Sequence, residues 1–389
     1  MSNQLQDGEM MKKYHQMKIA GVQNKYFDIT IKDGKFDLVK EVKRSGLSEK
    51  QEEEKKQDNL WMAPGIIDLH THLAWTDFDS ENQQKREKSE IFRMQEQAFQ
   101  ATLRTGVTTV RDAGGLLPDE AEAIKKYRGC PLRVLPCGGM FSGSDAKGIA
   151  FLENQTDKMQ KTGAKWIKIF ATGGLGAPPD KVLEPMFGRD EFFAIVQKAH
   201  ACGMKTMIHT WGGITIDWAI EAGADTLEHG VYLTKEQAEG LEKSKMPYIP
   251  TTAIYRIAAD KNGVLGLNRE LRDRAAKAAE NHPRAVAYAK EAGVKIGFGT
   301  DFATPALHGN NLQEIYTMQD CGLTVNEVWQ SATTAAAEIL GYQNSLGKIE
   351  EGFISDAVIY NRDPLQAVSA EELQNSIVSV ITGQGHLFS

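Results

Sequence analysis

Two histidines follow a short apolar run near the start of the chain, and their spacing suits a metal ion. The run Ile66 to Leu69 predicts a buried strand, and His70 and His72 come directly after it. Side chains two residues apart in a strand project to the same side, so both imidazoles would leave its C-terminal end together. Such a pair can share one divalent ion. An isolated His-x-His pair is, however, more often a surface feature.

Further residues that can bind metals stand within or just after later apolar runs. They are Lys168, His209, His229 and Asp301. Taken singly, each has an ordinary structural explanation: a hydrogen-bonded histidine, a lysine stem leading to water, or an aspartate capping the next segment. Taken together, they predict a metal site. A lysine buried as an ammonium ion is costly, and CO2 would convert it into a carbamate with two bridging oxygens.

The segments that must position these residues alternate between short apolar runs and helical stretches from Pro64 onward. Eight strands are expected, at residues 66–69, 107–111, 132–137, 166–171, 204–208, 225–228, 248–251 and 294–299. We therefore predict an α/β fold, a (β/α)8 TIM-like barrel, with the candidate site at the C-terminal ends of its strands. The alternative is a doubly wound open sheet, but no Gly-rich phosphate loop follows the first strand.

Both ends of the chain carry additional strand-like runs that predict a small β domain. These runs are residues 17–22, 26–32 and 36–42 before the barrel, and 356–360 and 377–382 after its last helix, which is expected at 325–340. We expect residues 1–62 plus 346–389 to form the small composite domain and 63–345 to form the barrel. Residues 1–16 are expected to be a loose polar lead, and the charged residues 43–59 a solvated loop or exposed helix.

The overall composition narrows the classes of protein that fit the chain. The 389 residues are 41% hydrophobic and 25% charged, with a net charge of -7, so a nucleic-acid partner is not expected. The sequence shows no apolar run near the roughly 20 residues of a membrane span and no signal-peptide core at its start. Four scattered cysteines fit reduced thiols. We expect a cytoplasmic protein without a membrane partner.

Several longer stretches make the chain resemble the amidohydrolase superfamily. They are PGIIDLHTHL (64–73), GVTTVRDAGG (106–115), WIKIFATGG (166–174), GTD (299–301) and, near the end, SLGKIEEGFISDAVIYNRDPL (345–365). The resemblance covers nearly the whole chain. Within the superfamily the chain is most similar to the binuclear branch of prolidase-like Xaa-Pro dipeptidases and related carboxypeptidases acting on N-acyl amino acids.

The resemblance implies a pair of divalent metal ions, which we expect to be zinc, and a role for each candidate ligand. One ion would be held by His70, His72 and Asp301, and the other by His209 and His229. Carbamylated Lys168 and a water would bridge them, and the ions would lower the pKa of that water. Asp301 would pass its proton to the leaving amine. Asp68 is expected to accept a hydrogen bond from a histidine ligand.

Other residues near the strand ends are candidates for contact with a small-molecule or dipeptide-like substrate. Tyr232 could donate a hydrogen bond to a developing oxyanion, and Arg256 could pair with a substrate carboxylate. Tyr255 and His308 are further pocket-facing candidates. Loops 75–88 and 175–188 are long enough to roof the site, with apolar walls from Trp75, Phe78, Leu175 and Met186.

The expected function is hydrolysis of an amide bond in a dipeptide or N-acyl amino acid, by an enzyme that forms a homo-oligomer. A deaminase or cyclic-amide hydrolase of the same fold is an alternative, although a carbamate bridge has little purpose with one ion. A lactone or organophosphate hydrolase would use the same two metals. An inactive relative serving as a binding protein is a further alternative, but all six ligand positions hold ligating residues.

Overall fold

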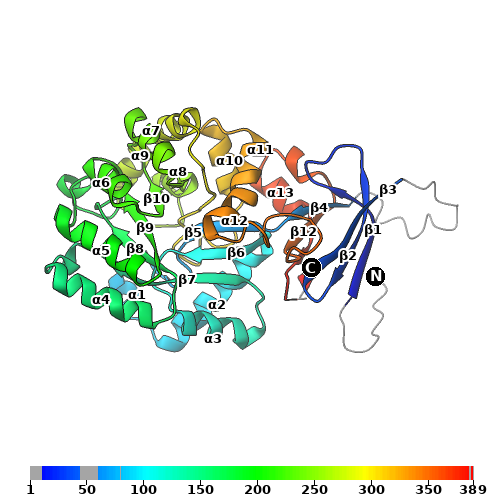
Figure 1. Ribbon diagram of the computed structural model, residues 1–389, viewed down its shortest axis with the longest axis horizontal. Coiled ribbons are helices and arrows are strands. Elements are labelled where there is room, and N and C mark those ends of the chain that lie inside the picture. Colours follow the sequence, from blue (N-terminus) through cyan, green and yellow to red (C-terminus); the bar gives the residue numbers. More distant parts are fainter. Residues whose placement is uncertain (1–10, 44–59, 79, 385–386, 389) are drawn as a thin grey trace.

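The computed structural model describes residues 11–43, 60–78, 80–384 and 387–388 of the chain. It contains two seven-stranded sheets, one curved into a barrel and one beside it (Figure 1). The barrel sheet runs in chain order from β5 to β11, and every neighbouring pair in it is parallel. The other sheet has the order β14-β13-β12-β4-β1-β2-β3 and so joins the two ends of the chain.

The barrel strands are short and, apart from β7, which is mostly half-buried, they are largely buried, as their apolar runs predict. They are β5 (Ile66–Thr71), β6 (Val107–Asp112), β7 (Arg133–Phe141), β8 (Trp166–Phe170), β9 (Lys205–Thr210), β10 (Thr226–His229) and β11 (Tyr248–Ile249). Every residue of β5, β6 and β10 is buried. The expected (β/α)8 architecture is therefore confirmed, with one difference at the eighth position.

The eighth predicted strand, residues 294–299, closes the barrel without forming a continuous ladder. Ile296 makes an isolated parallel bridge to Tyr248, and the amide of Leu69 donates to the carbonyl of Phe298 at 2.8 Å. The backbone here passes very close to its neighbours, because a Cβ at Gly299 would lie 2.5 Å from Ile249 and 2.9 Å from His70. Glycine allows this approach, and the segment bonds irregularly to both sides.

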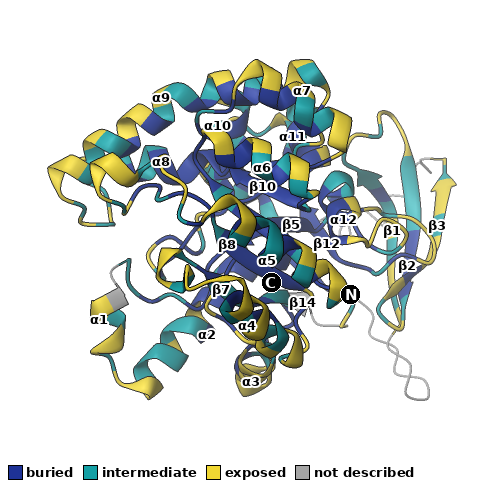
Figure 2. Ribbon diagram, turned by 60° about the vertical axis from the view of Figure 1, so that its left-hand side comes forward, coloured by how far each residue is buried: buried dark blue, intermediate teal, exposed yellow. Residues whose placement is uncertain are grey.

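Helices cover the outside of the barrel, with exposed outer faces and buried inner ones (Figure 2). Those that follow the strands are α2 (Lys88–Arg104), α3 (Pro118–Arg128), α4 (Ile149–Lys161), α5 (Arg189–Ala201), α6 (Ile214–Ala222), α7 (Lys235–Ser244), α8 (Thr252–Ala259), α9 (Arg269–Ala292) and α10 (Gln313–Asp320). Short α1 (Ser80–Gln84) precedes α2. Among the described residues, no helix has the length and apolar content needed to cross a membrane.

The helix predicted at 325–340 is instead two helices, α11 (Val325–Ser331) and α12 (Thr334–Leu340). The carbonyls of Ser331 and Ala332 leave the helical pattern and accept from the amides of Phe298 and Ile67, at 3.1 and 2.8 Å. The hydroxyl of Thr333 bonds back to the carbonyl of Trp329 at 2.6 Å, an alternative that helix interiors disfavour. The break therefore ties the last helical unit to the barrel.

The second sheet is built from both chain ends, as predicted. Its strands are β1 (Met11–Ile19), β2 (Tyr26–Lys32), β3 (Lys35–Val42), β4 (Trp61–Pro64), β12 (Ala357–Tyr360), β13 (Ile377–Ile381) and β14 (Leu387–Phe388). Strand β4 pairs antiparallel with β12. The expected loose lead is wrong for residues 11–16, which form the first part of β1 and pair with β2. Residues 1–10 and 44–59 lie outside the described residues, and the domain limits at 62/63 and 345/346 stay predictions.

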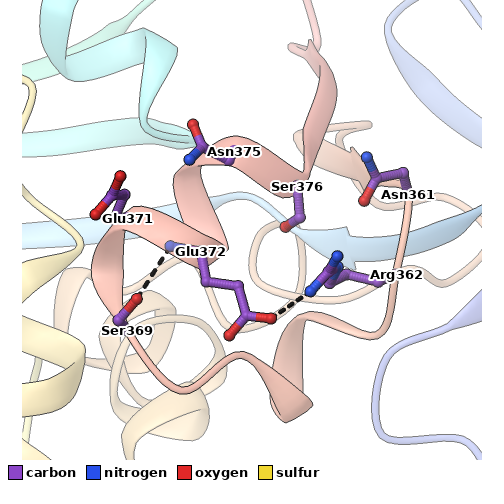
Figure 3. A pocket seen from close by; sticks show the side chains of 7 residues that line it. All are labelled: Asn361, Arg362, Ser369, Glu371, Glu372, Asn375 and Ser376. Atoms are coloured by element: carbon purple, nitrogen blue, oxygen red, sulfur yellow. Dashed lines mark hydrogen bonds and ion pairs between the residues drawn. The ribbon is translucent and has the colours of Figure 1, made fainter.

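Helix α13 (Ala370–Ser376) borders a polar hollow of about 360 Å³, and two interactions join residues of its lining. The amide of Glu372 donates to the hydroxyl of Ser369 at 3.1 Å, and its carboxylate pairs with Arg362 (Figure 3). This hollow contains none of the candidate metal ligands.

Candidate metal centre

The six candidate ligands converge at the C-terminal end of the barrel. His70 is the second-last residue of β5, and His72 lies just beyond that strand. Lys168 is in β8, His209 is in β9, and His229 is the last residue of β10. Asp301 follows the irregular eighth segment. The ring centroids of His209 and His229 are 4.4 Å apart, and those of His70 and His229 are 4.8 Å apart. The ligand atoms of His70, His229 and Asp301 all lie within 4.8 Å of one another.

The first two histidines direct the same ring nitrogen at one carboxylate. The Nε2 atoms of His70 and His72 lie 3.4 and 3.3 Å from Asp301 Oδ1. On the other side of each ring, His70 Nδ1 lies 2.6 Å from Glu228 Oε2, and His72 Nδ1 lies 3.3 Å from the carbonyl oxygen of Gly114. Both acceptors place the ring proton on Nδ1, which leaves each Nε2 lone pair free for a metal.

Lys168 is fully buried between these groups, with its Nζ 3.0 Å from His70 Nε2. Burial lowers the pKa of Lys168 to about 8, against the opposing pull of the Glu228 and Asp301 carboxylates. A substantial fraction of the amine is therefore neutral near pH 8. A neutral, buried amine beside metal-ligand nitrogens is well placed to be converted into an anion.

Of the remaining two histidines, His229 is buried and His209 is partly exposed, and both are uncharged. Burial holds the pKa of both His209 and His229 well below the usual value, so both keep a lone pair for a metal. Among the described residues, His209 Nε2 has no hydrogen-bond partner. Buried polar atoms are nearly always paired, and a metal ion would satisfy this one. Imidazole nitrogens with a carboxylate are the donor set that zinc prefers, so the residues fit the expected ions.

A buried ion pair between Arg111 and Glu228 lies next to the candidate metal centre, on the inner side of the His70 ring. Arg111 Nη2 donates to Glu228 Oε1 at 2.9 Å, and neither side chain is exposed. Arg111 Nε also donates to the carbonyl of Leu69 at 2.7 Å, and its guanidinium lies 4.4 Å from the centre of the Trp166 ring. Glu228 thus joins the His70 imidazole to an arginine anchored in the barrel interior.

Asp68 accepts a hydrogen bond from His70, as expected, but from its backbone amide and not from its ring. Its carboxylate accepts from the amides of His70 and Thr300, both at 3.1 Å, and from the Thr300 hydroxyl at 2.8 Å. Those bonds join β5 to the eighth segment and leave the His70 ring to Glu228. A signal was available in the sequence, because Arg111 and Glu228 are opposite charges inside two predicted buried strands.

The family of the chain follows from its match to a protein-family model. The amidohydrolase family model matches residues 61–385, which includes the barrel and all six candidate ligands. The chain belongs to the amidohydrolase family.

Relatives of this amidohydrolase include enzymes with named activities. Ochratoxinase of Aspergillus niger is 29% identical over 244 residues, which are 62% of this chain and half of the relative's length. A crystal structure of an amidohydrolase superposes with a TM-score of 0.85 at 26% identity, covering 97% of this chain and 99% of that one. A Xaa-Pro dipeptidase with bound methionine in its active site gives 0.83 at 23% identity, covering 98% and 100%. The last likeness shows a shared fold.

Tyr232 lies at the mouth of the amidohydrolase barrel. It is half-buried, with its ring 6.3 Å from that of Trp211, and burial raises the pKa of its phenol so that it stays a donor. Together with Val182, Leu183 and the first part of α9 it lines a cavity of about 620 Å³. This position is three residues beyond His229, and it suits contact with a bound molecule.

The other three expected substrate contacts are placed differently. Tyr255 is buried against Trp211, His229 and His282, with ring centroids 5.2, 6.4 and 5.3 Å away. His308 is also buried, with its Nδ1 3.4 Å from Thr102 Oγ1. Arg256 pairs with Asp320, so a carboxylate of the protein already engages its guanidinium. Their roles toward substrate stay predictions.

The loops expected to roof the site contribute unequally. Trp75 stacks on His72 with ring centroids 4.2 Å apart. Phe78 and Leu175 join an apolar cluster around Trp211, whereas Met186 packs against the main core. Arg274 of α9 donates to the carbonyl of Leu175 at 2.6 Å, and this bond holds the start of the 175–188 loop against α9.

We expect Glu228→Gln to weaken metal binding by roughly 10- to 100-fold, because the His70 ring loses its charged acceptor. The same change leaves Arg111 buried without a counter-charge, so the free energy of unfolding should fall by about 3–5 kcal/mol. Titration of the metal-free protein with zinc and urea unfolding measure the two effects.

The matched control is Glu327→Gln, which removes a glutamate that pairs with Lys290 on the protein surface. It should change the free energy of unfolding by no more than about 1 kcal/mol. If Glu228→Gln behaves like this control in both measurements, the buried pair does not support the metal centre.

Proposed function

We propose that this amidohydrolase is a binuclear metal-dependent hydrolase that cleaves the amide bond of a dipeptide or an N-acyl amino acid. One observation carries the proposal: a buried lysine, Lys168, lies 3.0 Å from the ring of His70 within a set of four histidines and an aspartate. A lysine has no metal-binding use as an ammonium ion. As a carbamate it supplies an anion with two oxygens, which is what a pair of ions needs between them.

Formation of the carbamate needs the Lys168 amine, CO2 and an acceptor for one proton. The neutral amine forms an N–C bond to CO2, one C=O bond becomes a C–O⁻ single bond, and the proton lost from the nitrogen passes to solvent water. The lowered pKa of Lys168, about 8, provides the neutral amine. Fixing this anion among imidazoles and divalent ions replaces a costly buried ammonium with a compensated charge.

The residues of the chain divide the remaining work of amide hydrolysis. His70, His72 and Asp301 would hold one ion, and His209 and His229 the other. When bound, the ions supply a lowered pKa for an attacking water and polarisation of the scissile carbonyl. Asp301, whose side chain is 20% exposed, has access to that water and would carry its proton to the leaving amine.

The cavity beside Tyr232 supports a substrate with an extended apolar group. Val182 and Leu183 form its apolar side, and Arg274 on its rim already pairs with Glu270 at 3.0 Å. A dipeptide or N-acyl amino acid could place an apolar side chain there. Ochratoxinase and the Xaa-Pro dipeptidase, which are similar to this chain, are consistent with that choice.

We expect Tyr232→Phe to lower kcat by about 10²-fold while KM changes little, because the hydroxyl would bond to an oxyanion present only in the transition state. Steady-state kinetics on the best amide substrate measures both constants. Tyr127→Phe, on the exposed outer side of α3, is the matched control. A rise in KM with unchanged kcat would place Tyr232 in ground-state binding instead.

A substrate panel tests the proposed reaction directly. The panel should contain dipeptides including Xaa-Pro, N-acyl amino acids, cyclic amides, aminopurines, lactones and phosphotriesters, assayed with zinc and bicarbonate. Highest kcat/KM on a linear amide supports the proposal. Preference for cyclic amides or ring amines would favour the deaminase-like alternative, and preference for esters the lactonase or phosphotriesterase alternative.

Zinc as the metal, a homo-oligomeric state and a cytoplasmic location remain part of the proposal. The histidine-rich ligand set favours zinc over harder ions such as magnesium. Elemental analysis, light scattering and cell fractionation test these three points.

A further inference from the structure

Three residues at the mouth of the barrel have left-handed backbone conformations. His229, Thr251 and Asp301 have φ values of 69°, 56° and 55°, and none of them is glycine. They stand at the ends of β10, β11 and the irregular eighth segment, respectively. Such conformations are unfavourable for residues other than glycine and persist only where the surroundings hold them. Thr251 is a pronounced case because its Cβ is branched.

The strained residues contact one another at the proposed metal centre. His229 Nδ1 lies 2.8 Å from Thr251 Oγ1 and 3.8 Å from Asp301 Oδ2. His229 therefore has to keep both its backbone and its ring in place for the second ion. The next question is which side chains hold the His229 backbone in this conformation.

Two buried side chains donate to the carbonyl oxygen of His229. His282 Nε2, from α9, lies 2.9 Å from it, and the Tyr248 hydroxyl, from β11, lies 2.7 Å from it. A carbonyl only accepts hydrogen bonds, so the His282 ring proton is on Nε2. His282 is 1% exposed and Tyr248 is fully buried, and neither side chain is a candidate ligand.

A histidine at position 282 is not explained by packing alone. Burial lowers the pKa of His282 to about 4, so the ring is neutral. Its Nδ1 has no partner among the described residues, and leaving a buried polar atom unpaired destabilises the folded protein. A phenylalanine would fill a similar volume without that cost. What histidine adds is the hydrogen bond to His229.

We propose that His282 and Tyr248 are positioning residues that clamp the strained backbone of His229 and so set the position of its imidazole as a metal ligand. This inference rests on the proposed function, since it takes His229 as a ligand. It assigns the hydrogen bonds that hold the His229 backbone to side chains of α9 and β11, which are not among the six candidate ligands. These hydrogen bonds hold His229 in place before an ion binds. The unfavourable backbone conformation of His229 is therefore stabilised during folding and not at the expense of metal affinity.

The test is a zinc titration of the metal-free protein in competition with a chromogenic chelator, beside urea unfolding. His282→Phe should weaken one of the two zinc equivalents by roughly 10- to 100-fold and leave the other unchanged. His282→Gln, whose amide can donate to the same carbonyl, should restore most of the lost affinity. Tyr248→Phe keeps the ring and removes only the hydroxyl, and it should produce the same selective loss if His282→Phe fails to fold.

Several outcomes would overturn the inference. If folded His282→Phe or Tyr248→Phe binds both zinc equivalents with wild-type affinity, these side chains do not position His229. Equal losses in His282→Phe and His282→Gln would assign the effect to packing. The matched control is His200→Phe, which replaces a histidine of α5 that pairs with Asp225. This variant should bind both zinc equivalents normally. A wild-type protein that binds no zinc contradicts the proposed function itself, which distinguishes the two failures.

Discussion

Lys168→Ala is expected to abolish most hydrolytic activity and to release at least one metal ion per chain. The variant loses the one bridge between the ions that the protein itself is proposed to supply. Metal assistance is worth several kcal/mol in the transition state, which corresponds to roughly a thousand-fold in rate. Elemental analysis and kcat/KM on the best amide substrate measure the two losses together.

The alanine variant also leaves space where a carbamate stood. A short carboxylate such as propionate has a similar charge and shape, so adding it at high concentration should restore part of the metal content and activity. Lys205→Ala is the matched control: that lysine begins β9, at the opposite end of the strand from His209, and its Nζ lies over the Trp166 ring. Full metal content and activity in Lys168→Ala would remove the bridge from the mechanism.

Asp301→Asn is expected to have the second large effect, a fall in kcat of about 10²–10⁴-fold. The amide keeps the size of the carboxylate but cannot take a proton from water or return it to the leaving amine. Asp301 also lies 3.3–3.4 Å from the Nε2 atoms of His70 and His72. Some weakening of one ion is therefore expected as well.

Measurements at saturating zinc separate the two roles of Asp301. If the metal content is restored and kcat remains low, the proton-transfer role is supported. If kcat returns with the metal, the carboxylate acts only as a ligand. Asp320→Asn, which affects a carboxylate on α10 paired with Arg256, should leave kcat unchanged.

The convergence of the six candidate ligands could be predicted because parallel strands place their C-terminal ends together. A histidine or aspartate at the end of an apolar run therefore has a known destination once the barrel is inferred. His70 and Asp301 are 231 positions apart in sequence but come within hydrogen-bonding range by this rule alone. The pairing of the two chain ends in one sheet could be predicted on a different ground, because the last strand-like runs come after the final barrel helix and cannot join the barrel.

The supporting contacts could not be predicted in this way, since they depend on which side chains meet inside the barrel. Strand positions alone do not say that Glu228, and not Asp68, reaches the His70 ring. The position of Arg256 depends on the packing of α8 against α10, and the role of His282 depends on the direction of the His229 carbonyl. The break between α11 and α12 likewise follows from carbonyls that bond to the barrel.

The central claim is that the chain holds two metal ions bridged by a modified lysine, and metal content tests it most directly. Protein purified without chelators and in the presence of bicarbonate should contain two divalent ions per chain by elemental analysis. Its intact mass under native conditions should also exceed that of the metal-loaded polypeptide by the mass of one CO2. One ion per chain would contradict the binuclear account and favour the deaminase-like alternative. No bound ion, even after incubation with zinc or manganese, would contradict the hydrolase account altogether.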